Sequence, residues 1–179
     1  GYTSKTVTYN TEFTKEGVYK VHEGLDLTLN PFEIGGDLSK LIDINPIYFD
    51  LGKHFIRKDA AIELDKIVKV MNENPTMEIE LGSHTDSRGS DESNRALSDR
   101  RAKSSAAYIS ERLTTGKDRI SGKGYGESIP NTIDLSAEGG DANFKLIESY
   151  INSFKRKKRK EYDRLHQLNR RTEFIIKKM

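Results

Sequence analysis

The sequence predicts an α/β sandwich, in which helices cover one or both faces of a β-sheet. Segments with alternating apolar and polar residues, typical of strands, take turns with longer segments whose apolar residues recur at helical spacing. Glycine, proline and polar clusters separate the two kinds of segment. The length of 179 residues fits one domain with an extension rather than two full domains.

The first 40 residues predict a strand-rich extension, a linker or the end of a preceding domain. Short β-prone pieces alternate with chain breakers over residues 6–29, and Asn30-Pro31 and Gly35-Gly36 then favour a linker. The main domain is therefore expected over residues 41–179.

The first half of the main domain contains two strand patterns, each followed by a helix pattern. A strand over residues 47–50 follows Asn45-Pro46, and a strand over 77–82 alternates apolar and polar residues. Helices are expected over residues 59–71 and 92–113. Their buried stripes are Ala60, Leu64, Ile67, Val68 and Met71 in the first, and Ala102, Ala106, Ile109 and Leu113 in the second.

The second half predicts a short strand over residues 119–126 and a final strand over 172–176. Between them, residues 132–168 read as an inserted helical segment. Its apolar residues recur at helical spacing and predict one long, partly exposed helix. They are Phe144, Ile147, Ile151, Phe154, Tyr162 and Leu165.

Composition narrows the classes of function. Thirty basic and 28 acidic residues leave a net charge of +2, so the overall charge does not call for nucleic acid, and no nucleic-acid partner is expected. The absence of cysteine excludes thiol catalysis, disulfides and cysteine-ligated metal. The amino end lacks a signal-peptide profile and opens abruptly on β-prone residues, which suggests a piece of a longer, exported protein.

Three polar residues, Asp86, Asn94 and Arg101, converge near the start of the second predicted helix. Asn94, Leu97 and Arg101 share one helix face, and that face begins beside Asp86. A carboxylate and a guanidinium bordering one site fit a zwitterion, with Asp86 accepting an ammonium and Arg101 gripping a carboxylate. A simpler interpretation stays open, in which Asp86 and Arg101 pair with each other and tie the loop to the helix.

The motif around this site resembles the C-terminal domain of the outer-membrane protein A (OmpA) family. It begins with residues 82–90, Gly-Ser-His-Thr-Asp-Ser-Arg-Gly-Ser, and continues with Asn94, Leu97, Ser98, Arg101 and Ala102. Tyr48-Phe49-Asp50, Ala60-Ala61 with Leu64, residues 122–127 and Asn169-Arg170-Arg171 follow the family's order. The resemblance covers residues 41–179 and implies a β-α-β-α-β-α-β order with a mixed sheet.

The resemblance implies a non-enzymatic domain that needs no cofactor and binds peptidoglycan. Asp86 and Arg101 would hold the ammonium and carboxylate of diaminopimelate in the stem peptide. Asn94 and Leu97 would line the site, backbone around Phe49 and Asp50 would contact the ligand more weakly, and Arg170 would support the site or the sheet. The parent protein would be associated with the bacterial outer membrane and face the periplasm, and a flagellar stator subunit is a subordinate alternative.

Two other functions compete with this interpretation. The basic run over residues 155–160 could bind an anionic polymer, lipid headgroups or nucleic acid, although a solvated helix face explains it more simply. A metal-dependent hydrolase built on His54, His84 and His166 with Asp86 is the least favoured class, because no second histidine lies at the spacing from His84 that a zinc motif has.

Overall fold

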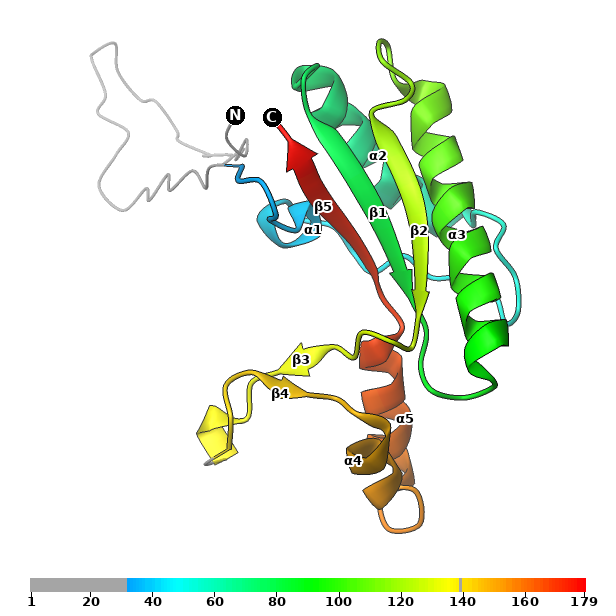
Figure 1. The fold of residues 1–179 in the computed structure, drawn as a ribbon, viewed down its shortest axis with the longest axis vertical. Helices are drawn as coiled ribbons and strands as arrows, with labels where there is room; N and C mark the ends of the chain where they lie inside the picture. The colour runs from blue at the N-terminus through cyan, green and yellow to red at the C-terminus, as the bar shows by residue number, and fades with distance from the viewer. Residues whose placement is uncertain (1–31, 139) are drawn as a thin grey trace, which may run out of the picture.

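A computed structural model describes residues 32–138 and 140–179, and its centre is a three-stranded sheet (Figure 1). The strands are β1 (Glu78–His84), β2 (Ile120–Gly126) and β5 (Thr172–Lys178), in the order β2-β1-β5. β1 runs parallel to β2 and antiparallel to β5. The mixed sheet and its three strand positions confirm the sequence prediction for this part of the chain.

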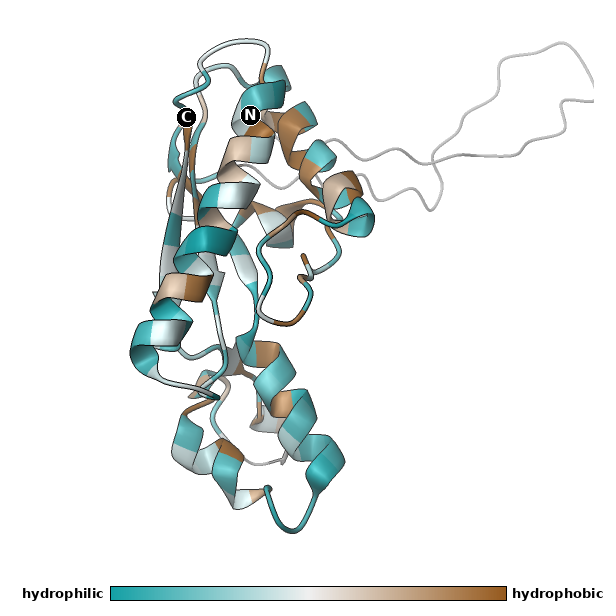
Figure 2. Cartoon of the chain, turned by 90° about the vertical axis from the view of Figure 1, so that its right-hand side faces the viewer, coloured by the Kyte–Doolittle hydropathy of each residue, from teal (hydrophilic) through white to brown (hydrophobic). Residues whose placement is uncertain are grey.

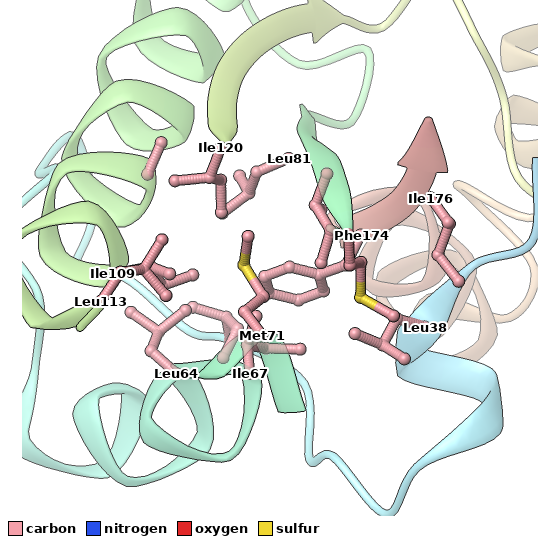
Figure 3. Packing of buried hydrophobic residues seen from close by; sticks show 14 of the residues in the cluster. Leu38, Leu64, Ile67, Met71, Leu81, Ile109, Leu113, Ile120, Phe174 and Ile176 are labelled. Atoms are coloured by element: carbon pink, nitrogen blue, oxygen red, sulfur yellow. The ribbon is translucent and has the colours of Figure 1, made fainter. Parts of the chain in front are cut away.

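Two helices cover one face of this sheet. α3 (Asp91–Arg112) packs on β2 and β1, and α2 (Lys58–Glu73) packs on α3. Their apolar stripes meet the inward side chains of the strands, and each fully buried aliphatic or aromatic side chain contributes about 1.5–3 kcal/mol (Figure 3). The outer face of α3 is largely hydrophilic (Figure 2). None of the helices in the described residues is long and apolar enough to cross a membrane.

The predicted strand over residues 47–50 is wrong, because these residues form a loop. The free edge of β5 is already occupied by residues 35–37. Gly35 N donates to Ile176 O at 2.7 Å, Ile176 N donates to Gly36 O at 3.0 Å, and Asp37 Oδ1 accepts from Phe174 N at 2.9 Å. The family's expected order therefore lacks its first strand here, and the loop instead contacts Arg101 near the middle of α3.

The residues just before the predicted domain boundary belong to the packed body. Asp37 caps the short helix α1 (Leu38–Leu41), and Phe32 and Leu38 are buried in the main core. The boundary predicted near residue 41 therefore falls inside the fold. The strands expected over residues 6–29 lie outside the described residues.

The inserted segment forms a small module at one end of the sheet (Figure 1). The strands β3 (Thr132–Ile133) and β4 (Phe144–Lys145) pair, a 3-10 turn η1 (Ser136–Glu138) lies between them, and the helices α4 (Glu148–Ser153) and α5 (Arg159–Asn169) follow. The expected single long helix is wrong. Like charges at helical spacing in the basic run over residues 155–160 disfavour a continuous helix, and the chain turns over residues 154–157 before α5 begins at Arg159.

The module has a small hydrophobic core that is separate from the main core. Its buried residues are Leu146, Ile151, Tyr162 and Leu165. Asn169 at the end of α5 ties the module together, because its Nδ2 donates to Leu146 O at 2.9 Å and its Oδ1 accepts from Asn131 N at 2.8 Å. The module thereby holds α5, and with it Arg170, beside the loop after β1.

Candidate functional site

The loop between β1 and α3 carries the candidate site. Gly89 adopts φ +113°, a conformation that favours glycine, and lets the chain turn into α3. Ser90 caps the helix by accepting a hydrogen bond from Ser93 N at 3.3 Å. These local features place Asp86 in the short loop that leads into α3, as the sequence predicts.

Asp86 is buried, with 5% of its surface exposed, and is bound by two arginines. Its Oδ2 lies 2.7 Å from Arg88 Nη2 and 2.6 Å from Arg170 Nη1, while its Oδ1 accepts from Arg88 N at 3.0 Å. Burial alone would raise the pKa of Asp86, but the hydrogen bonds and charge of Arg88 and the charge of Arg170 outweigh burial and lower it. Asp86 therefore stays a carboxylate at neutral pH.

Arg101 is oriented by the loop that lacks the predicted strand. Its Nε donates to Lys53 O at 2.9 Å and its Nη2 to Asp50 O at 3.2 Å, while its guanidinium carbon lies 5.0 Å from the centre of the Phe49 ring. Burial, followed by the positive charges of Arg170 and Arg100, lowers the pKa of Arg101. The guanidinium is thus fixed in place by neutral carbonyls rather than by an acid.

Asp86 and Arg101 form no ion pair with each other within the described part of the chain. The simpler interpretation, in which these two residues tie the loop to the helix, is therefore wrong. Asp86 pairs instead with Arg88 of its own loop and with Arg170 at the end of α5, at distances of 2.7 and 2.6 Å.

A cavity of about 260 Å³ lies beside Arg101, between the loop over residues 47–51 and the start of β5. Arg101, Arg170 and Arg171 contribute cationic groups to its wall, and Tyr48 and Phe49 contribute aromatic rings. Asp86 is not part of this wall but pairs with Arg170, which is. The cavity is therefore suited to an anionic group, with an aromatic surface on one side.

The remaining predicted site residues have different surroundings. Asn94 is buried, and its Nδ2 donates to Asp86 O at 3.1 Å and to Glu127 Oε2 at 2.5 Å, so it braces the loop. Leu97 is half-buried on α3, and neither residue lines the cavity. Asp50 offers its carbonyl to Arg101, while its side chain pairs with Arg57 at 2.8 Å.

Sequence reasoning missed Arg88, although it lies only two residues after Asp86. It also missed that His84 and Arg171 both pair with Glu173 on the sheet: His84 Nε2 lies 3.3 Å from Glu173 Oε2, and Arg171 Nε donates to Glu173 Oε1 at 2.6 Å. The His84 ring and the Arg171 guanidinium together lower the pKa of Glu173 to about 2, despite its burial. Pairing across the sheet, which brings His84 of β1 beside Glu173 of β5, is the signal that could have identified these contacts. Reading it requires the register between the two strands.

Several buried polar atoms near Asp86 have no hydrogen-bond partner among the described residues. They are Thr85 Oγ1, Ser87 Oγ and both ring nitrogens of His166. Such atoms are rare in folded proteins unless water or a ligand satisfies them. No group of three or more histidine or acidic residues is placed to hold a metal ion within residues 32–138 and 140–179.

Solved structures share the fold at low sequence identity. The peptidoglycan-associated lipoprotein from Burkholderia pseudomallei gives a TM-score of 0.50 at 19% identity, covering 73% of this chain and 87% of that one. A putative MotB like protein from Desulfovibrio vulgaris gives a TM-score of 0.51 at 18% identity, covering 74% of this chain and 68% of that one. These likenesses show an α/β fold with a mixed sheet and helices.

Curated relatives match part of the chain. Outer membrane porin F from Pseudomonas aeruginosa is 29% identical over 100 residues, which are 56% of this chain and 29% of the porin. The peptidoglycan-associated lipoprotein from Buchnera aphidicola is 31% identical over 93 residues, 52% of this chain and 53% of the lipoprotein. A part of the Photosystem I P700 chlorophyll a apoprotein A2 from Gloeobacter violaceus is 34% identical over 95 residues, 53% of this chain and 11% of that protein.

The matches thus span from about a tenth to about half the length of these relatives. A family model described as the OmpA family matches residues 48–145, which is more than half of the chain. That range holds Asp86, Asn94, Leu97 and Arg101 together with the loop around Phe49. The chain belongs to the OmpA family.

Proposed function

We propose that this chain binds peptidoglycan without catalysis, through the diaminopimelate of the stem peptide, and so anchors an envelope protein or the outer membrane to the cell wall. Family membership supports a binding role, as do relatives named peptidoglycan-associated lipoprotein and outer membrane porin F. The proposed location is the periplasmic face of the outer membrane. The observation that carries the proposal is the charge of Arg101 at the cavity wall.

Arg101 has the properties of a carboxylate receptor. Hydrogen bonds to two loop carbonyls fix the plane of the guanidinium, but no acid within the described residues forms an ion pair with it. Burial, and after it the neighbouring charges of Arg170 and Arg100, lower the pKa of Arg101, so an anion in the cavity would relieve repulsion as well as form charge-assisted hydrogen bonds. The carboxylate of a stem-peptide residue supplies such an anion.

Asp86 is the proposed receptor for the ammonium group of the same ligand residue. Its lowered pKa keeps it charged, and Arg170 connects it to the cavity wall. Each charge-assisted contact is worth about 1.5–3 kcal/mol, so one stem peptide is expected to bind with a Kd on the order of micromolar to millimolar. Many copies facing one polymeric wall would convert this weak binding into durable attachment.

The test is co-sedimentation of the purified chain with sacculi that contain diaminopimelate. Wild type is expected in the pellet, and Arg101→Ala and Asp86→Ala are expected in the supernatant once circular dichroism has established that both are folded. Arg95→Ala is the matched control, because Arg95 is an exposed arginine on the same helix outside the cavity. Wild-type protein that stays in the supernatant would refute the proposal.

A further inference from the structure

We propose that the side chain of Arg88 competes with the ligand's ammonium group for Asp86. Arg88 must therefore leave Asp86 before a zwitterion can bind. This inference rests on the proposed function and adds a specificity-determining residue to it. Arg88 supplies the positive charge beside Asp86 that the ligand's ammonium group would supply in its place. The site would therefore select a ligand that offers an ammonium and a carboxylate together.

Arg88 already binds Asp86 Oδ2, the carboxylate oxygen to which the ligand's ammonium group would donate. Arg88 Nη2 and Nε lie 2.7 and 3.1 Å from Asp86 Oδ2. An ammonium group and a guanidinium both donate to carboxylate oxygens at these distances, so they compete for the same atom. The backbone N–H of Arg88 holds the other oxygen, Oδ1, at 3.0 Å and would stay there when the side chain moves.

Arg88 is better placed to leave than Arg170, the other arginine on Asp86 Oδ2. The side chain of Arg88 is 42% exposed, against 34% for Arg170. Arg170 is also bound by Gln167 and forms part of the cavity wall, so its departure would dismantle the site. Displacing Arg88 leaves Asp86 with Arg170 and frees one side of Oδ2.

The inserted module offers Arg88 a second acceptor. Arg88 Nη1 lies 3.7 Å from Asp163 Oδ1 on α5, so the guanidinium already bridges the loop and the module. Asp163 also accepts from Arg159 Nε at 3.0 Å and is half-exposed, which leaves it able to take a closer hydrogen bond from Arg88. When the ligand's ammonium group replaces Arg88 on Asp86 and Arg88 moves to Asp163, the carboxylates of both aspartates keep a cationic partner.

The exchange predicts opposite effects for two substitutions. Arg88→Ala removes the competitor and is expected to bind a soluble stem tripeptide ending in diaminopimelate about tenfold more tightly, a change of about 1.4 kcal/mol. Asp163→Asn removes the second acceptor, retains Arg88 on Asp86 and is expected to weaken binding several-fold. The double variant is expected to match Arg88→Ala, because Asp163 acts only through Arg88.

The measurement is isothermal titration calorimetry of the full chain at low salt, with Arg95→Ala as the control for removal of an exposed arginine and Arg88→Gln as a second variant if Arg88→Ala unfolds. As a comparison ligand, a second tripeptide whose diaminopimelate side chain lacks the amine is titrated into the same variants. Because it cannot replace Arg88 on Asp86, its affinity is expected to be the same for wild type and Arg88→Ala.

Equal or weaker binding of the amine-bearing peptide by folded Arg88→Ala, or by Arg88→Gln in its place, would overturn the inference, and so would additive effects in the double variant. If wild type still pellets with sacculi in that case, the proposed function stands without the competitor. If wild type binds neither sacculi nor peptide, the proposed function fails and this inference fails with it.

Discussion

Substituting Gly124 with alanine tests how α3, which carries Asn94 and Arg101, is held against the sheet. A Cβ at residue 124 would lie 2.1 Å from Asp99 N and 2.5 Å from Asp99 Cα. Real Cβ atoms essentially never come closer than 3.0 Å to such a neighbour, so the α3 backbone would have to retreat from β2 by about 0.9 Å. Backbone atoms of a helix cannot yield by changing rotamer.

The magnitude follows from overpacking at a buried helix–strand contact. Overpacking typically costs about 1–3 kcal/mol, and we expect about 3 kcal/mol here because the clash is with backbone. For a protein of this size each kcal/mol lowers Tm by about 2–4 °C, so Tm should fall by about 6–12 °C. Displacement of α3 would also stretch the hydrogen bond from Gly126 N to Ser98 Oγ, now 2.9 Å.

Urea unfolding followed by circular dichroism, with a parallel thermal melt, measures this effect. Gly82→Ala is the matched control, since Gly82 is also a strand glycine, but its Cβ would meet Tyr125 Cε2 at 3.2 Å. An aromatic ring can shift by a few tenths of an ångström, so the control should lose less than about 1 kcal/mol. Equal losses in the two variants would refute the argument that close backbone approach requires Gly124.

Two further predictions concern acid stability and the basic run. The pKa of Glu173 is about 2 in the folded protein against an ordinary value of 4.5. The ionised side chain therefore contributes up to about 3 kcal/mol to the free energy of unfolding. This contribution is present above pH 4.5 and is lost as the pH falls toward 2. The stability difference between wild type and Glu173→Gln should therefore shrink over that range in urea titrations, and a constant difference would contradict the assignment. Replacing the exposed residues Lys155, Arg156, Lys157 and Lys158 by glutamine should change stability by no more than about 0.5 kcal/mol and leave sacculus binding intact. Loss of sacculus binding in this folded variant would instead favour the anionic-polymer function.

Local periodicity predicts most of the central fold. The helix expected over residues 92–113 is α3 (Asp91–Arg112), and the strand expected over 172–176 lies within β5 (Thr172–Lys178). These elements each bury one face, so their apolar spacing reports their structure directly. The prediction holds where a segment's own pattern decides its conformation.

The wrong secondary-structure predictions occur where contacts with a distant segment of the chain determine the local conformation. Residues 47–50 have the composition of a strand, but residues 35–37 already pair with β5. Phe144 has helical spacing to Ile147, yet it lies opposite Ile133 in a two-stranded pairing. Neither the competition for a sheet edge nor a partner in the inserted segment can be read from the periodicity of the segment itself.

In the candidate site, too, local spacing predicts some features, whereas others depend on distant segments. Spacing predicts that Asp86 and Arg101 border one site. In the structure Asp86 lies in the loop before α3 and Arg101 lies halfway along that helix, and Arg170, which binds Asp86, shares the cavity wall with Arg101. The partners of these residues depend on Arg170 at the end of α5 and on the loop carbonyls of Lys53 and Asp50. Tertiary contacts of this kind lie beyond the reach of sequence spacing, which explains why the pairing of Asp86 with Arg170 was missed; the pairing with Arg88 is local and was overlooked.

Titration of a soluble diaminopimelate stem tripeptide into ¹⁵N-labelled protein, followed by two-dimensional NMR, tests the central claim most directly. The account predicts saturable shifts at the Arg101 Nε–H and at the backbone amides of residues 86–89, with the amides of residues 155–158 unchanged. An absence of shifts at millimolar peptide, or shifts confined to residues 155–158, would contradict it.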